Sequence, residues 1–166
     1  MSAINRRKLF QALINYAFTR ERKGRVKKDI RFGITNAGEK VFVIDGKAAY
    51  KLEADECFID AEKIFPKHVW LRSAENLFIP SYHDTRCFLT WKGRSFKTNT
   101  GLHCLIFNTE SGEEIFIQSS VFDMIDRENV SLCVCRNFNL DYKQHTLVYA
   151  YQDDNCIAVF MPVKVN

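Results

Sequence analysis

The chain has 166 residues, the length of one domain, and 46% of them are apolar and 13% aromatic, which is enough to build a core and argues against disorder. The formal charge is +4 at pH 7, and no run approaches the ~18 consecutive apolar residues of a membrane-spanning helix. No apolar run follows the basic start, so we expect no secretory signal, no membrane partner and a cytoplasmic protein.

An amphipathic helix is predicted to open the chain. Its apolar stripe follows helical spacing and consists of Leu9, Leu13, Tyr16 and Ala17. Either Ser2 or Asn5 can cap the start, and the pattern fades near Thr19.

The basic residues gather in this opening segment and in the polar run that follows it. Residues 6–31 contain ten Lys or Arg against two acids, a net +8, so the rest of the chain sums to −4. The ten are Arg6, Arg7, Lys8, Arg20, Arg22, Lys23, Arg25, Lys27, Lys28 and Arg31. Such clustering creates a local positive field, which attracts phosphates or an acidic partner.

Three antiparallel strands are predicted after the helix. Residues 30–35 alternate, turn at 36–39 and return at 40–44. Asp45-Gly46 is a hairpin signal that leads into residues 47–52.

The remainder of the chain reads as strands and turns with two short helices. In chain order these are a helix at 60–65, a strand pair at 69–72 and 76–79, strands at 87–90 and 95–98 around a turn at 91–94, strands at 103–107 and 114–118, a helix near 120–126 opened by a capping box at Ser120, and strands at 130–135, 146–151 and 156–165. The predicted fold is therefore α+β, with an N-terminal amphipathic helix packed on an antiparallel sheet.

We expect a single domain spanning residues 1–166. Segments 38–43 and 112–117 are similar, each beginning with Gly-Glu before an alternating strand. This similarity is compatible with an internal repeat, with a helix and three strands in 1–56 and a strand-rich remainder in 57–166.

Three segments at the two ends of the chain resemble the bacterial sliding clamp, the processivity factor of replicative DNA polymerase. Residues 4–13 are similar to its first helix. Residues 41–50 resemble the strand in which an Ala-Thr-Asp-Gly turn precedes an arginine, and 158–165 resemble the Met-Pro-hydrophobic-Arg ending. A clamp subunit has several domains, whereas this chain has room for little more than one.

The resemblance implies repeated helix-plus-sheet units whose basic helices face DNA. It also implies a homo-oligomer, because a chain of this length can encircle a duplex only as an assembly. Lys and Arg on a helix and a loop carry no base code, so the implied contact with phosphates is independent of DNA sequence.

A second candidate contact lies at residues 91–97. Trp91, Lys92 and Arg94 place an aromatic ring among cations, a combination that suits stacking on unpaired bases beside held phosphates. The alternative is that Trp91 and Phe96 point into the core while the cations face water.

The sequence offers little support for catalysis or for a metal. The six cysteines lie mostly in apolar runs such as 132–135, and no Cys-x-x-Cys pair is present. His83, Asp84 and Cys87 are close in sequence, but nothing marks an activated nucleophile. We expect a protein with no catalytic residue, no metal and no cofactor.

The sequence thus predicts a non-enzymatic protein that binds DNA or another polyanion, with a clamp-like role in replication. The predicted contacts are Arg6, Arg7, Lys8, Arg20, Arg22, Lys23, Arg25, Lys27, Lys28, Trp91, Lys92 and Arg94. The alternative is a small inhibitor or adaptor that docks the same basic patch on an acidic host protein. A solvated helix face followed by a polar loop explains the charges without any partner.

Overall fold

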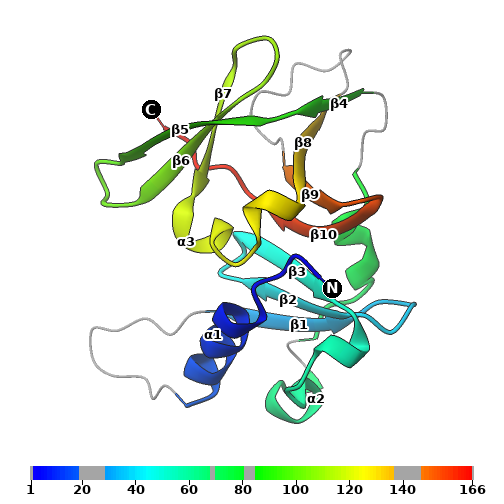
Figure 1. Cartoon of the computed structure of the whole chain (residues 1–166). Coiled ribbons are helices and arrows are strands. Elements are labelled where there is room, and N and C mark those ends of the chain that lie inside the picture. The colour runs from blue at the N-terminus through cyan, green and yellow to red at the C-terminus, as the bar shows by residue number, and fades with distance from the viewer. Residues whose placement is uncertain (1, 19–28, 68–69, 81–84, 137–146, 166) are drawn as a thin grey trace.

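The computed structural model describes residues 2–18, 29–67, 70–80, 85–136 and 147–165, and these form two antiparallel sheets with helices packed on them (Figure 1). The α+β prediction is confirmed. The elements are α1 (Arg6–Phe18), β1 (Ile30–Ile34), β2 (Lys40–Ile44), β3 (Ala48–Leu52), η1 (Ala54–Glu56), α2 (Ala61–Ile64), η3 (Ala74–Phe78), β4 (Thr85–Phe88), β5 (Thr90–Lys97), β6 (His103–Asn108), β7 (Glu114–Gln118), α3 (Ser119–Phe122), η4 (Arg127–Asn129), β8 (Ser131–Arg136), β9 (Val148–Gln152) and β10 (Asn155–Phe160).

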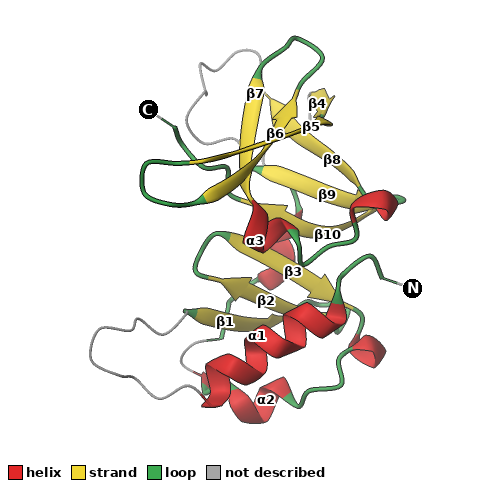
Figure 2. Ribbon diagram, turned by 60° about the vertical axis from the view of Figure 1, so that its left-hand side comes forward, coloured by secondary structure: helices red, strands yellow, loops and turns green. Residues whose placement is uncertain are grey.

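The larger sheet has seven strands in the order β1-β2-β3-β10-β9-β8-β4. Two three-strand meanders, β1–β3 and β8–β10, meet through their last strands, which run antiparallel to each other. A helix precedes each meander, α1 before β1 and α3 before β8. The smaller sheet has the order β5-β6-β7 and lies at the other end of the molecule from α1 (Figures 1 and 2).

One face of the seven-stranded sheet carries most of the core. The paired positions Phe32, Phe42, Tyr50 and Ala158 form a row across four strands, and all four side chains are buried. Because Ala158 is small, the Tyr50 ring has room beside it. The Tyr50 hydroxyl donates to the Val121 carbonyl at 2.5 Å, which ties α3 to the sheet. Burial raises the pKa of this phenol far above its ordinary value, so the group stays a neutral donor.

The helix α1 lies across β1–β3 on this same face, with α2 beside it (Figure 2). Leu9 and Leu13 are fully buried, as the helical stripe predicts. Phe65, just after α2, is also fully buried and stacks on both Tyr16 of α1 and Phe32 of β1. Aromatic packing therefore holds the two helices against the sheet.

A second apolar cluster lies on the opposite face, where η3 covers the sheet. The predicted strand pair at 69–72 and 76–79 is wrong in this region: residues 74–78 form a 3-10 helix, and Trp70 makes an isolated bridge to Phe32. Val69 lies outside the described residues. The close approach of η3 to β1 requires a glycine at position 33, because a Cβ at Gly33 would lie only 2.9 Å from the Ala74 Cβ. The helical turn then buries Ala74 and Phe78 together.

The predicted turn at 91–94 is also wrong. Residues 90–97 are one eight-residue strand, β5, that pairs with β6. The register shifts between Trp91 and Ser95, and Gly93 adopts φ +72° within this irregularity. A glycine at positive φ occurs in β-bulges as well as in turns, so the sequence pattern around Gly93 does not distinguish the two.

Two predicted boundaries also require correction. The helix near 120–126 begins at Ser119 and ends at Phe122, and its N-cap position is Gln118, without a side-chain cap bond, so Ser120 is not the cap. The last strand ends at Phe160, not at 165. Beyond it, the Met161 N–H donates to Lys47 and the Val163 N–H donates to Phe116, so the chain crosses from the large sheet to the small one.

The similarity between 38–43 and 112–117 has a local structural explanation. In each case a threonine, Thr35 or Thr109, accepts a hydrogen bond through its hydroxyl from the N–H four positions on, at 3.1 Å. The glycines between them, Gly38 and Gly112, have φ of +84° and +85°. Thr98 forms a third turn of this kind. The shared Gly-Glu therefore reflects one turn type used repeatedly, and an internal repeat stays a prediction.

Within the described part of the chain, no helix is both long enough and apolar enough to cross a membrane.

Candidate nucleic-acid interface

The start of α1 is firmly anchored to the rest of the molecule. Asn5 is the N-cap, since its Oδ1 accepts from the Lys8 N–H at 3.1 Å. The Asn5 N–H itself donates to the Met124 carbonyl, and Ile4 bridges to Ile125 after α3. The first turn of the helix is thus held in place before any ligand arrives.

Three of the predicted contact residues form this first turn. Arg7 and Lys8 are exposed, and Arg6 is partly exposed. Among the residues that the structure describes, none of the three forms an ion pair with an acid. Leu9, directly after them, is buried, so the helix orientation fixes which way the cations face.

This charge arrangement opposes the helix dipole. The first turn of α1 contains no acidic residue and its last turn no basic one. Unpaired N–H groups give a helix start a partial positive charge, so acids are stabilising there and cations are not. The cations in the first turn therefore do not stabilise the helix. A bound anion would reduce the repulsion among them.

Arg6 is positioned by an aromatic residue. Its guanidinium lies 5.5 Å from the centroid of the Phe58 ring, and Phe58 meets Phe10 edge-on at 6.3 Å. Phe58 itself is 76% exposed. The contact places the Arg6 guanidinium beside an exposed aromatic ring.

An open groove of about 800 Å³ lies between the start of α1 and the segment that follows α3. Its lining is mixed in charge, with cations Arg6, Arg7, Lys8 and Arg127 and acids Asp123, Asp126 and Glu128. Two of the acids are already engaged. Asp123 binds Arg127 at 3.0 Å, and Asp126 caps η4 by accepting from the Glu128 N–H and the Asn129 amide.

The second predicted contact lies on an edge strand rather than on a hairpin tip. Trp91, Lys92 and Arg94 belong to β5 and all three are exposed, Trp91 by 46%. Arg94 pairs with Glu114 at 3.2 Å on the neighbouring surface. Phe96 instead packs edge-on against Phe116 and is half-buried. The core interpretation thus fits Phe96, but Trp91 faces solvent.

Arg127 links the two predicted contacts. It lines the groove at the start of α1 and also a pocket of about 360 Å³ beside Trp91. Its guanidinium lies 4.8 Å from the Trp91 ring centroid and 5.4 Å from that of Phe122. Phe88 of β4, 52% exposed, lines the same pocket.

Sequence reasoning missed both Arg127 and Phe88. Arg127 stands among Asp123, Asp126 and Glu128, where a lone cation carries no signal of its own. Phe88 lies in an apolar run that reads as an ordinary buried strand. Only the fold brings them next to Trp91.

The other predicted contacts lie outside the described residues. They are Arg20, Arg22, Lys23, Arg25, Lys27 and Lys28, in the segment between the end of α1 and the start of β1.

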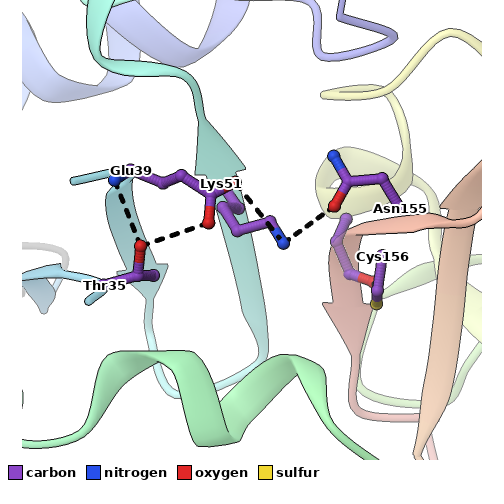
Figure 3. Close-up of polar contacts among 6 residues, drawn as sticks. Thr35, Glu39, Lys51, Asn155 and Cys156 are labelled. Atoms are coloured by element: carbon purple, nitrogen blue, oxygen red, sulfur yellow. Dashed lines mark hydrogen bonds and ion pairs between the residues drawn. The ribbon is translucent and has the colours of Figure 1, made fainter. Parts of the chain in front are cut away.

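A cleft of different character lies beside the end of β3 and the β9–β10 turn. It has a volume of about 590 Å³, and half of its lining residues are acids: Glu39, Glu53, Glu56, Asp153 and Asp154. Lys51 also lines the cleft, with its Nζ 3.6 Å from the Glu39 carboxylate and 3.0 Å from the Asn155 side-chain oxygen (Figure 3). The bond to Asn155 joins β3 to β10. Within the described ranges, no group of three or more His, Cys, Asp or Glu could hold a metal ion.

The thiols fit a structural role. All six are free, and Cys104, Cys133 and Cys156 are buried. Burial, reinforced by the neighbouring Cys135, raises the pKa of Cys133 to about 12, and burial raises that of Cys156 to about 12 as well. At neutral pH these groups are protonated, and a protonated thiol is a poor nucleophile.

This gives a direct prediction for alkylation. With iodoacetamide at pH 8, we expect Cys104, Cys133 and Cys156 to be modified in the folded protein far more slowly than in urea, where all six thiols react. Peptide mass spectrometry measures each site separately. Modification of folded Cys133 at the rate of the unfolded chain would contradict the burial described above.

No protein-family model, curated protein or solved structure matches this chain. The resemblance to sliding clamps therefore stays a prediction.

Proposed function

We propose that this protein is a non-enzymatic nucleic-acid-binding protein. Its phosphate contacts are Arg6, Arg7, Lys8 and Arg127, joined by the basic residues between α1 and β1. The observation that carries the proposal is the first turn of α1, where exposed cations stand against the helix dipole. A phosphate bound there gains from the cations and from the helix N–H groups at once.

The proposed cellular role is that of a clamp-like accessory factor in DNA replication. The two meanders, β1–β3 and β8–β10, support this role, since a helix precedes each and both helices pack into the same core. Such a repeated helix-plus-sheet arrangement is what the resemblance to sliding clamps implies. The role requires a homo-oligomer, because one chain of this size cannot surround a duplex.

The first experiment measures binding of a generic DNA duplex by fluorescence anisotropy as salt is raised. We expect binding at low salt and a linear fall of log K with log salt, with a slope of about −0.9 for each phosphate neutralised. Reversing Arg22, Lys23 and Lys27 to glutamate is expected to weaken binding and to flatten that slope by about one unit per lost contact. Absence of binding to both duplex and single strand at low salt would remove the proposal.

Light scattering tests the clamp-like role separately. A ring requires more than one subunit, so we expect a mass that is a multiple of 19.4 kDa. A strict monomer that still binds DNA would retain the nucleic-acid proposal and eliminate the encircling role.

A second candidate function is that of an adaptor or inhibitor that docks on an acidic host protein. The observation in its favour is Phe58, an aromatic side chain that is 76% exposed beside Arg6. Aromatic and arginine side chains dominate binding energy at protein interfaces. Co-purification from native lysate distinguishes the two functions, since a protein partner survives nuclease treatment and a partner bridged by nucleic acid does not.

A further inference from the structure

The chain passes from the large sheet to the small one between β4 and β5, and this passage leaves an aromatic pocket at the surface. The Leu89 N–H donates to the Leu132 carbonyl at 2.9 Å, which fixes the crossing point. On either side of it, Phe88 and Trp91 line the pocket while remaining about half exposed. Phe107, which is buried, contributes to the apolar lining.

The side chain of Arg127 lies at this pocket in a fixed position. Arg127 lies over the Trp91 ring and is anchored by Asp123 at 3.0 Å. Because Arg127 also lines the groove at the start of α1, the pocket adjoins the proposed phosphate-binding surface at this residue. The volume of about 360 Å³ lies at the lower end of the range for small-molecule sites, about 300–1,000 Å³.

We propose that this pocket takes an unpaired nucleobase, so that the protein binds single-stranded nucleic acid in preference to duplex. The inference rests on the proposed nucleic-acid binding and deepens it, and it does not depend on the clamp-like role. Exposed aromatic faces stack on bases, and guanidinium planes do the same, but bases inside a duplex are already stacked on one another and cannot enter. Arg127 is paired with Asp123, so the charge that the adjoining phosphate needs comes from Arg6, Arg7 and Lys8 in the neighbouring groove. Stacking of this kind selects unpaired bases without reading their identity.

The test follows the fluorescence of Trp91 during binding. The chain has two tryptophans, and the other, Trp70, is removed by Trp70→Phe. We expect an oligothymidylate of about 12 nucleotides, at low salt, to quench the emission of the remaining Trp91, whereas a duplex of similar length leaves it unchanged. If Trp70→Phe does not fold, the difference between the wild type and Trp91→Phe isolates the same signal.

Affinities measured by anisotropy provide the second arm. Trp91→Ala is expected to weaken binding of the oligothymidylate by about 5- to 150-fold, the loss of one stacked base, and to change duplex binding by less than about twofold. Trp91→Phe keeps a ring and is expected to retain most of the affinity. Ile79→Ala is the matched control, because Ile79 is 52% exposed next to η3 on the opposite face of the large sheet.

The outcomes separate the inference from the function on which it rests. If oligothymidylate and duplex both bind but neither quenches Trp91, and Trp91→Ala behaves like Ile79→Ala, the stacking pocket is overturned and the nucleic-acid function stands. If neither nucleic acid binds, both fail. Trp91 quenched by anionic lipid vesicles or by an acidic peptide, but not by oligothymidylate, overturns the inference in favour of another occupant.

Discussion

Replacing Arg7 and Lys8 together with glutamate is expected to weaken DNA binding by at least about tenfold while making the protein slightly more stable. Binding falls because two phosphate contacts are lost, which also flattens the salt slope by about two units. Stability rises because the exposed first turn of α1 then carries acids in place of cations, and each such charge is worth about 0.3–1 kcal/mol with the helix dipole. A gain of about 1 kcal/mol raises Tm by about 2–4 °C in a chain of this size.

Because affinity is expected to fall while stability rises, this variant separates loss of the interface from loss of the fold. Anisotropy titrations and thermal melts on the same samples measure both quantities. The matched control is the double variant Lys47→Glu/Arg72→Glu, which changes the net charge equally at exposed positions in the β2–β3 turn and just before η3. Should the Arg7 and Lys8 reversal lower Tm as well as affinity, the loss of binding would reflect misfolding. Unchanged affinity would exclude the helix start from the interface.

Truncating Phe65 to alanine is expected to cost about 3–5 kcal/mol of the free energy of unfolding. Phe65 is 1% exposed and stacks on Tyr16 at 5.2 Å and on Phe32 at 5.7 Å between ring centroids. Removing its ring leaves a cavity where α1, α2 and the sheet meet. That cost is a large share of the ~5–15 kcal/mol that stabilises a typical domain, so urea unfolding followed by circular dichroism should show a clear shift of the midpoint.

Phe58→Ala is the natural comparison for this variant. It removes the same side chain from a position that is 76% exposed, so its effect on stability is expected to stay within about 0.5 kcal/mol. Equal destabilisation by the two variants would mean that the aromatic stack does not hold α1 on the sheet.

The elements that could be predicted from the sequence are those determined by residues close together in the chain. The stripe of Leu9 and Leu13 predicts α1 because helical spacing is readable within a few turns. Likewise, β1–β3 follow from short apolar segments and from the turns between them, which need little beyond their own residues. The first-turn cations of the candidate site were visible for the same reason.

Elements that depend on residues distant in the sequence could not be predicted. Residues 74–78 become a 3-10 helix because Gly33, far away in sequence, leaves room for Ala74. Gly93 permits a turn or a bulge equally, and the partner strand β6 decides in favour of the bulge. The place of Arg127 between two surfaces arises only after both sheets have formed.

The strand order has a consequence for how this protein is made. β3 gains its second neighbour only from β10, and Lys51 and Asn155, which fasten the two strands, are 104 positions apart. On the ribosome, the apolar edge of the first meander therefore stays open until almost the whole chain has emerged. Pairings across such separations form slowly, and open strand edges attract other chains. Biogenesis should therefore depend more strongly on chaperones than the modest size of the product implies.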